Sequence, residues 1–150
     1  MRRGLVKTVA VLGLTLTISV VLGALAPQAH ADWAPRRDML TWMNRARHER
    51  GAVALDRAWV LRQMADEHSR DMARQGRIFH TTNLAYELRN VSWRCAGENV
   101  GVGPKLRSLF DAFMRSDAHR ANILNRDFRR VGIGVYRADG LIWITLIFVG

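Results

Sequence analysis

The chain has 150 residues, enough for one domain, and its 49% hydrophobic and 24% charged residues are typical of a globular protein and exclude wholesale disorder. Its net charge of +10 comes almost wholly from arginine, because 21 of the 23 basic residues are Arg. Such a charge suits a polyanionic partner, whether nucleic acid, anionic lipid or an acidic wall polymer. The single cysteine excludes an intramolecular disulfide and any multi-cysteine metal site.

Residues 1–31 have the features of a secretory signal peptide. Three basic residues precede an uncharged run over residues 8–26, and Ala29-His30-Ala31 then offers small residues where signal peptidase reads them. We expect cleavage after Ala31, which leaves a domain of residues 32–150 with a net charge of +7. An uncleaved membrane anchor is the alternative, and both place the domain outside the cytoplasm. No later stretch reaches membrane-spanning length, so we expect no transmembrane span after cleavage.

The expected domain begins with apolar residues at helical spacing. Pro35 suits the first turn of a helix that Gly51 ends, and Asp56 is expected to cap a second helix that Gly76 ends. The apolar faces of these two helices are Met39, Trp42, Met43 and Ala46, and then Leu61, Met64, Ala65, His68 and Met72. From residue 77 to residue 103 the pattern is irregular, and we expect loops with at most short strands there.

The second half of the chain predicts two more helices and then a β-hairpin. The third helix opens at Pro104, and Ser116 or Asp117 caps a short fourth helix. The Asp139-Gly140 turn before the apolar run 141–149 is typical of a hairpin. Because that run is apolar on both faces, we expect helices to cover the sheet on both sides. The sequence therefore predicts one α+β domain.

Several short motifs follow one another in a set order along the chain. They are Asn44-x-x-Arg47, Ala65-x-x-His68-Ser69-x-Asp71-Met72, Phe79-His80, Ala96-Gly97-Glu98-Asn99-Val100, the segment Ser116 to Leu124, and Val131-Gly132-Ile133-Gly134. In this order and spacing they resemble the CAP superfamily (cysteine-rich secretory proteins, antigen 5 and pathogenesis-related proteins), in particular its short bacterial SCP-like branch. The resemblance covers residues 37–149 and implies an α-β-α sandwich with a central antiparallel sheet flanked by helices.

The resemblance also implies a cleft lined by two histidines and two glutamates. Its first histidine corresponds to His80, the glutamate of its Gly-Glu-Asn motif to Glu98, and its second histidine to His119. Ser116 takes the place of the second glutamate, as it often does in short bacterial members. His80, Glu98 and His119 are three ligands that could hold a divalent metal such as zinc and leave one position open. The alternative is that these three side chains form a buried hydrogen-bond network without metal.

The resemblance implies no common catalytic reaction, so we expect a binding module rather than an enzyme. We expect it to be secreted or in the cell envelope and to bind a lipid, a glycan or an anionic envelope component. The alternative is a metal-dependent extracellular hydrolase with Glu98 as general base and a metal-bound water as nucleophile. A third alternative is a basic protein held at the wall or membrane surface by charge alone. No nucleic-acid partner is expected, because the sequence has no recognition motif for one.

The other chemistry-bearing residues are expected to be structural. His68 is expected to be a core histidine with its polar atoms satisfied, and Cys95 a buried thiol, with an intermolecular disulfide as the alternative. For the many arginines of the first two helices and of the chain end, we expect a solvated face rather than a basic patch. The arginines of the two helices are at positions 45, 47, 50, 57, 62, 70, 74 and 77.

Overall fold

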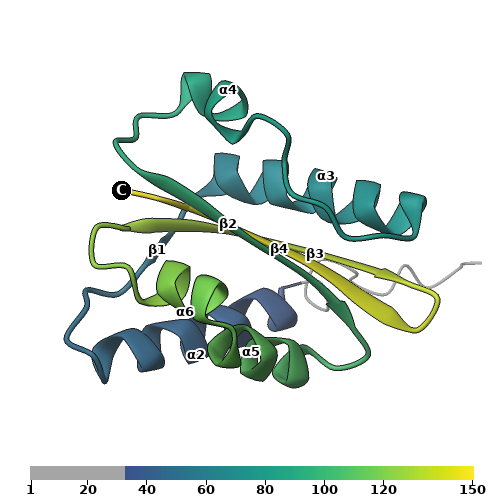
Figure 1. The fold of residues 1–150 in the computed structure, drawn as a ribbon, viewed down its shortest axis with the longest axis horizontal. Coiled ribbons are helices and arrows are strands. Elements are labelled where there is room, and N and C mark those ends of the chain that lie inside the picture. Colours follow the sequence, from purple (N-terminus) through teal and green to yellow (C-terminus); the bar gives the residue numbers. More distant parts are fainter. Residues whose placement is uncertain (1–32) are drawn as a thin grey trace, which may run out of the picture.

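A computed structural model describes residues 33–150, so the expected leader lies outside the described residues. The helices are α2 (Ala34–His48), α3 (Trp59–Gln75), α4 (Leu84–Glu87), α5 (Leu106–Arg115) and α6 (Asp117–Leu124), with a 3₁₀ turn at Leu88–Asn90. The strands are β1 (Asp56–Arg57), β2 (Ala96–Gly103), β3 (Arg130–Ala138) and β4 (Leu141–Val149). Helices α3 and α4 lie on one face of the sheet, and α2, α5 and α6 lie on the other (Figure 1). The expected α-β-α sandwich is confirmed.

Within residues 33–150 the sheet has four strands in the order β1-β3-β4-β2, which makes β1 and β2 its two edges. Strands β3 and β4 form the expected hairpin, and β4 also pairs antiparallel with β2 along its whole length. Asp139 and Gly140 form the turn with φ of 50° and 72°, the positive values that tight hairpin turns require. The short β1 pairs with β3 in parallel, so the sheet is mixed rather than wholly antiparallel.

The expectation of loops up to residue 103 is wrong for β2. This strand has eight residues and carries three glycines, which weaken the usual strand signal. The glycines are there because of close packing. A Cβ at Gly97 would lie 2.8 Å from Asn122 Oδ1, and one at Gly101 would lie 3.0 Å from the ring of Phe113. The sequence pattern of β2 is therefore set by the helices that cover it.

The expectation that Asp56 caps the second helix is also wrong. Asp56 lies in β1, where its N–H donates to the carbonyl of Arg129 at 2.8 Å. The N–H of Ala58 donates to the carbonyl of Val131 at 3.0 Å, and Ala58 is the residue before the first turn of α3. The pairing with β3 holds this segment extended, so the helix begins only after it. Gly76 ends α3 with φ of 63°, as expected.

Helix α3 packs directly against the sheet. A Cβ at Gly132 would lie 2.1 Å from the backbone of Leu61, and one at Gly134 would lie 2.0 Å from the carbonyl oxygen of Ala65. Only glycine lets the helix backbone approach β3 so closely. The helix begins beside β1 and extends to β2, where its His68 Nε2 lies 3.9 Å from an oxygen of Glu98. Helix α3 therefore supplies residues to both edges of the sheet.

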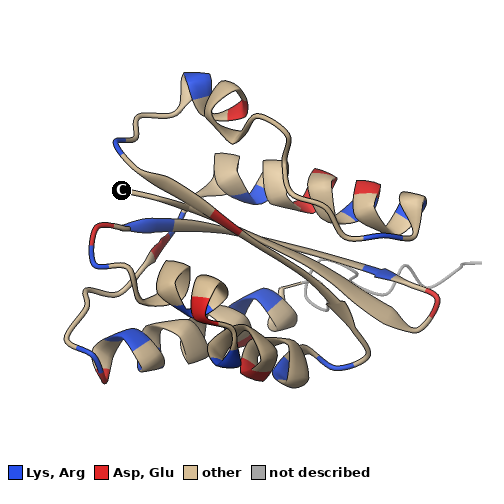
Figure 2. Cartoon of the chain, viewed as in Figure 1, with Lys and Arg blue, Asp and Glu red and all other residues tan. Residues whose placement is uncertain are grey.

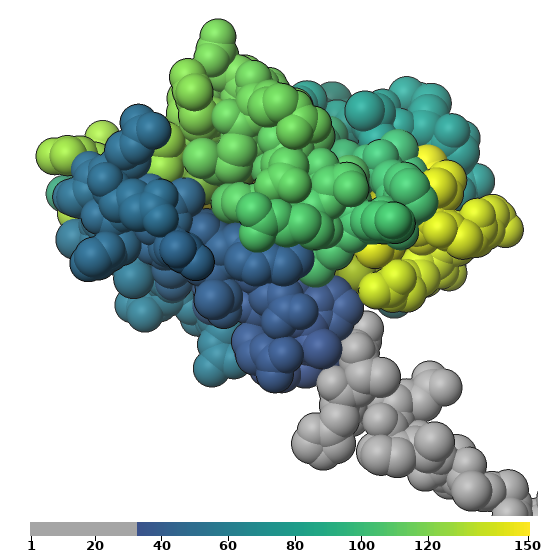
Figure 3. Space-filling model, turned by 90° about the horizontal axis from the view of Figure 1, so that it is seen from below, coloured from purple at the N-terminus to yellow at the C-terminus, as the bar shows by residue number. Residues whose placement is uncertain are grey.

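The opposite face of the sheet carries the largest apolar core, under α2, α5 and α6. These helices make up most of the surface seen from that side (Figure 3). Met39 and Met43 of α2 are fully buried in the same core as Phe110, and Cys95 is half-buried against that core. Cys95 has no disulfide partner within residues 33–150. In that same part of the chain, no helix is both long enough and apolar enough to cross a membrane.

The expectation of a solvated face is wrong for Arg47 of α2, whose side chain is fully buried. Its guanidinium donates to the carbonyls of Val53, Ile123, Asn125 and Phe128, at distances of 2.7, 2.8, 2.8 and 3.0 Å. This arginine ties the end of α6 and the following turn to the residues after α2. Figure 2 shows that the other Lys and Arg residues occur on helices of both layers and in the segments that connect the elements.

Candidate functional site

Glu98 lies in the edge strand β2, and its side chain is only 5% exposed. One carboxylate oxygen accepts hydrogen bonds from His80 Nδ1 at 2.7 Å and from the backbone N–H of Thr81 at 3.0 Å. The other oxygen accepts the hydroxyl proton of Thr81 at 2.6 Å. Because a carboxylate only accepts, His80 donates from Nδ1, and in the neutral imidazole Nε2 is the acceptor. The His80 side chain is 62% exposed. Glu98 thus orients a histidine that faces solvent.

The second pair of predicted residues lies where α6 begins. Ser116 precedes the first turn of α6, and its Oγ lies 2.9 Å from Nδ1 of His119. The His119 ring packs against Phe113, with 5.0 Å between the ring centroids. Burial lowers the pKa of His119, and the charge of His80 lowers it further. Both causes favour the neutral imidazole, as does the positive end of the α6 dipole.

Two asparagines join the pairs across the edge of β2. Successive residues of a strand face opposite sides of the sheet, so Glu98 points toward the α3 layer and Asn99 toward α6. Asn99 donates to the carbonyl of His119 at 3.0 Å. Asn122 of α6 donates to Asn99 Oδ1 at 2.8 Å and to the carbonyl of Glu98 at 3.1 Å. The four residues expected from the resemblance are therefore placed around one sheet edge, as two hydrogen-bonded pairs.

The side chains in this arrangement do not fit a three-ligand metal centre. In the part of the chain that the structure describes, no group of three or more His, Cys, Asp or Glu is placed to hold a metal ion. The carboxylate of Glu98 already accepts three hydrogen bonds, whereas the bonds of His80 and His119 use Nδ1 and leave Nε2 as the ring nitrogen that could bind a metal. Metal binding by His80, Glu98 and His119 stays a prediction from the resemblance. Of the alternative, a buried hydrogen-bond network of the three side chains, the structure contains the bond between Glu98 and His80, but His119 bonds to Ser116 instead and the His80 side chain is 62% exposed.

A groove of about 440 Å³ adjoins this cluster on the α3 side. It lies between α3 and the segment leading into α4, and its lining is Met64, Glu67, His68, Asp71, Phe79, Thr81, Thr82, Asn83, Glu87 and Ile147. Thr81 and His68 connect the groove to Glu98, because each lines the groove and approaches the carboxylate. His68 Nε2 bonds to the carbonyl of Phe79 at 2.8 Å, so the expected satisfied histidine is confirmed. The spacing of the sequence motifs does not predict that His68 lies beside Glu98.

The comparisons with known proteins agree on one family. The model of the cysteine-rich secretory protein family, CAP, matches residues 40–148. The YkwD protein of Bacillus subtilis is 32% identical over 114 residues, covering 71% of this chain and 44% of YkwD. The chain thus spans less than half the length of this relative.

Solved structures show the same fold. An extracellular protein of Bacillus anthracis that contains an SCP domain superposes with a TM-score of 0.72 at 24% identity, covering 85% of this chain and 44% of its own. An outer surface protein of Borrelia burgdorferi superposes with a TM-score of 0.70 at 16% identity, covering 77% and 91%. A cysteine-rich secretory protein of Staphylococcus aureus superposes with a TM-score of 0.67 at 23% identity, covering 77% and 38%.

Proposed function

This chain belongs to the CAP family of cysteine-rich secretory proteins, and on that premise we propose that it is an exported binding module. Its ligand would lie at the β2 edge, around His80 and His119, and in the groove that adjoins Thr81. Export is supported by the leader pattern of residues 1–31 and by the relatives, which are described as extracellular or outer surface proteins.

The state of Glu98 is the observation that favours binding over catalysis. A general base needs a carboxylate oxygen within reach of the proton that it removes. Here the side chain of Glu98 is 5% exposed, and both oxygens accept hydrogen bonds from His80 or Thr81. This carboxylate therefore acts as a support that fixes His80 and Thr81, and the fixed, solvent-facing His80 can form a hydrogen bond with a ligand through Nε2.

The lining of the groove favours a glycan over a lipid. Carboxylates of Glu67, Asp71 and Glu87 and hydroxyls of Thr81 and Thr82 supply acceptors, whereas Met64, Phe79 and Ile147 supply its apolar surface. Sugar hydroxyls donate to such carboxylates, and the apolar side chains suit the C–H face of a sugar ring. An acyl chain would leave the same polar groups without partners, which costs about 1–3 kcal/mol for each group that becomes buried.

Isothermal titration calorimetry with three probes tests this proposal. The probes are the neutral oligosaccharide chitotetraose, vesicles of phosphatidylglycerol, and zinc chloride alone. We expect chitotetraose to bind and His80→Ala to weaken the binding about tenfold, because the lost hydrogen bond is made by an oriented group. The matched control is His48→Ala, which replaces an exposed histidine at the end of α2. This control variant should bind as the wild type does.

Three outcomes would overturn the proposal. Binding of vesicles but not of chitotetraose, with the same loss in His80→Ala, would make the ligand a lipid. Shortening of the oligosaccharide, abolished both by a chelator and by Glu98→Gln, would show the metal-dependent hydrolase. Equal binding by wild type and His80→Ala, falling steeply with salt, would show attachment by charge alone.

A further inference from the structure

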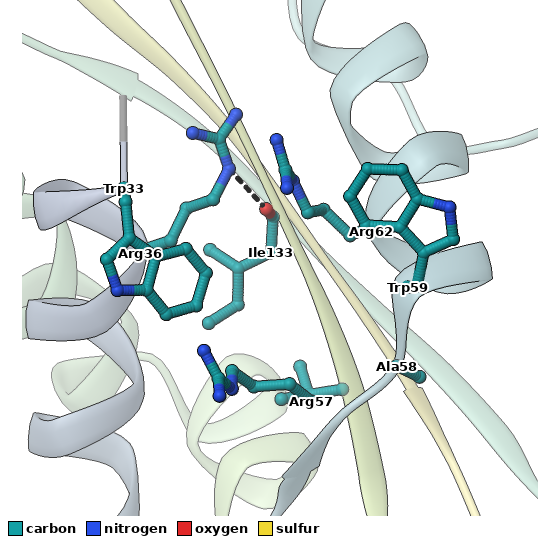
Figure 4. Close-up of a pocket in the computed structure, with 8 residues that line it drawn as sticks. Trp33, Arg36, Arg57, Ala58, Trp59, Arg62 and Ile133 are labelled. Atoms are coloured by element: carbon teal, nitrogen blue, oxygen red, sulfur yellow. Dashed lines mark hydrogen bonds between the residues drawn. The ribbon is translucent and has the colours of Figure 1, made fainter. Parts of the chain in front are cut away.

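The opposite edge of the sheet has a pocket of its own. It encloses about 340 Å³ between the beginning of α2, strand β1 and the beginning of α3. Its lining is Trp33, Arg36, Arg57, Ala58, Trp59, Arg62, Val131 and Ile133. Figure 4 shows Trp33 and Arg57 on one side of the pocket, Arg62 and Trp59 on the other, and Ile133 between them. Arginine and tryptophan thus form most of the wall.

Two guanidinium groups of the pocket stack on indole rings. Arg57 lies over Trp33 with 4.5 Å to the ring centroid, and Arg62 lies over Trp59 with 4.8 Å. A stacked guanidinium keeps its N–H groups in the plane of the group, where they can donate in parallel to a carboxylate. Stacking therefore prepares these arginines for a planar anion.

The pocket is built on rigid elements. The peptide units on either side of Arg57 are held by β3, through the bonds from Asp56 N–H and Ala58 N–H already described. Arg36 also lines the pocket. Its side chain is buried and held in place, because its Nε donates to the carbonyl of Ile133 at 3.1 Å. Asp66 binds both Arg36 and Arg62 and also accepts the N–H of Val135 at 3.1 Å. The backbone of Arg57 and the side chains of Arg36 and Arg62 are consequently held in place before any ligand arrives.

The residues that line the pocket include three arginines and no acidic residue. Asp66 is shared between Arg36 and Arg62, and no acidic side chain within residues 33–150 forms an ion pair with Arg57. Helix α3 begins at Trp59 on the rim, preceded by Ala58, whose methyl group cannot cap its first N–H groups. The positive end of that helix dipole adds to the field of the arginines. An anion is the complementary ligand.

We propose that this pocket binds a carboxylate-bearing sugar of an acidic glycan. The carboxylate pairs with Arg57, a hydroxyl of the sugar accepts from the N–H groups that Arg62 does not use on Asp66, and the sugar ring packs on the exposed part of Trp59 that Arg62 does not cover. The Trp59 side chain supports such contact because the residue is 63% exposed while its Cα is fixed at the start of α3. This site lies at the other sheet edge from the proposed function and does not depend on it.

The shape of the pocket favours a sugar over a lipid. Its apolar surface consists of the two indoles and the short side chains of Ala58, Val131 and Ile133. The exposed indole surface of Trp59 that Arg62 does not cover can pack against the C–H face of a sugar ring, whereas the short side chains offer little surface for an acyl chain. A sugar that carries a carboxylate can contact the indole surface with its ring and the arginines with its acid group.

Trigalacturonate is the probe that tests this proposal, measured by calorimetry with the purified protein. We expect saturable binding that weakens about tenfold or more in Arg57→Gln and in Trp59→Ala, through loss of the charge-assisted bond and of the stacking surface. Arg74→Gln removes one charge from an exposed position of α3 outside the pocket and should change the Kd less than about twofold. His80→Ala should bind trigalacturonate as the wild type does, which separates this site from the β2 edge.

Four results would overturn the proposal. Equal weakening by Arg57→Gln and Arg74→Gln would show attraction by net charge without a site. Binding of neutral galactotriose as tight as that of trigalacturonate would show that the arginines do not recognise the acid. Vesicles of phosphatidylglycerol that bind with the same dependence on Arg57 and Trp59 would make the ligand a lipid headgroup. If the folded wild type does not bind trigalacturonate at all, the pocket is not a site for an acidic glycan. Thermal melts of Arg57→Gln and Trp59→Ala confirm that the variants compared are folded.

Discussion

The two edges of one sheet carry opposite chemistry. At the β2 edge a buried glutamate fixes an exposed histidine, and the adjoining groove is lined with carboxylates and hydroxyls. At the β1 edge arginines stack on tryptophans around a positive pocket. The net charge of +10 for the whole chain does not predict the chemistry of either edge. The difference shows that a basic composition can coexist with an acid-lined groove, so the total charge does not identify the ligand.

Helix α3 is the element that the two edges share. Trp59 and Arg62 come from its beginning, and His68 and Asp71 come from its later turns. A change in the packing of α3 should therefore affect both edges, whereas a change in one strand edge should affect only that edge.

The largest effect is expected for Gly134→Ala, which would disturb both edges together. Its Cβ would lie 2.0 Å from the carbonyl oxygen of Ala65, so α3 must move away from β3. We expect the free energy of unfolding to fall by about 3 kcal/mol or more in urea denaturation, as in overpacked cores. Gly103→Ala is the control, because its Cβ meets only the flexible Leu109 side chain at 3.2 Å. Equal losses in the two variants would contradict direct packing of α3 on the sheet.

Glu98→Gln should disturb the β2 edge alone. Its amide nitrogen cannot accept a hydrogen bond, so a donor of His80 or Thr81 loses its partner. We expect a loss of about 1–3 kcal/mol in the free energy of unfolding and unchanged trigalacturonate binding. Glu67→Gln, at an exposed position of α3, should stay within about 0.5 kcal/mol of the wild type. A Glu98→Gln variant as stable as Glu67→Gln would show that the three bonds contribute nothing to folding.

The pH dependence of the free energy of unfolding reports on the β2 edge, because His119 lies there and its pKa is lowered. Burial, and then the charge of His80, lower the pKa of His119 in the folded protein below its ordinary value of 6.5. The unfolded chain therefore binds more protons at this residue, and its contribution to stability is lost as the pH falls below 6.5. We expect His119→Gln to flatten this dependence, and NMR titration of His80→Gln to show a higher pKa for His119. A His119 that titrates above 6.5 would contradict the buried environment.

The smallest effect is expected for the stability of Arg57→Gln. Arg57 is exposed, and its peptide neighbours are held by backbone bonds that the substitution leaves in place. We expect the free energy of unfolding to stay within about 0.5 kcal/mol of the wild type in urea denaturation. A larger loss would mean that the arginine stabilises the fold and would weaken the case that it is there for a ligand.

Elements with local signals could be predicted from the sequence. Pro35 opens α2, Gly76 ends α3, and Asp139-Gly140 turns the hairpin, because each acts through its own backbone geometry. Strand β2 could not be predicted in this way, since its glycines depend on helices that pack against it from elsewhere in the chain. The burial of Arg47 depends in the same way on four carbonyls supplied by distant segments.

The candidate site was predictable in part. The resemblance brought His80, Glu98, Ser116 and His119 together, and the structure places them at one edge as two pairs. The Arg57 pocket was not predictable, because Asp56 was expected to cap a helix. Its true position in β1 brings Arg57 to the sheet edge, where its guanidinium lies over the Trp33 ring. A two-residue strand has no periodicity of its own to reveal it.

The central claim is that the β2 edge binds a ligand, and amide chemical shifts measured by NMR during a titration with chitotetraose test it most directly. We predict that the shifts change at His80, Thr81 and Asn83 and in the turns of α3 that line the groove, while Arg57 and Trp59 are unaffected. His48→Ala should give the same pattern, and His80→Ala should need about tenfold more oligosaccharide to reach it. Shift changes confined to the Arg57 pocket, or none at any concentration, would contradict the claim.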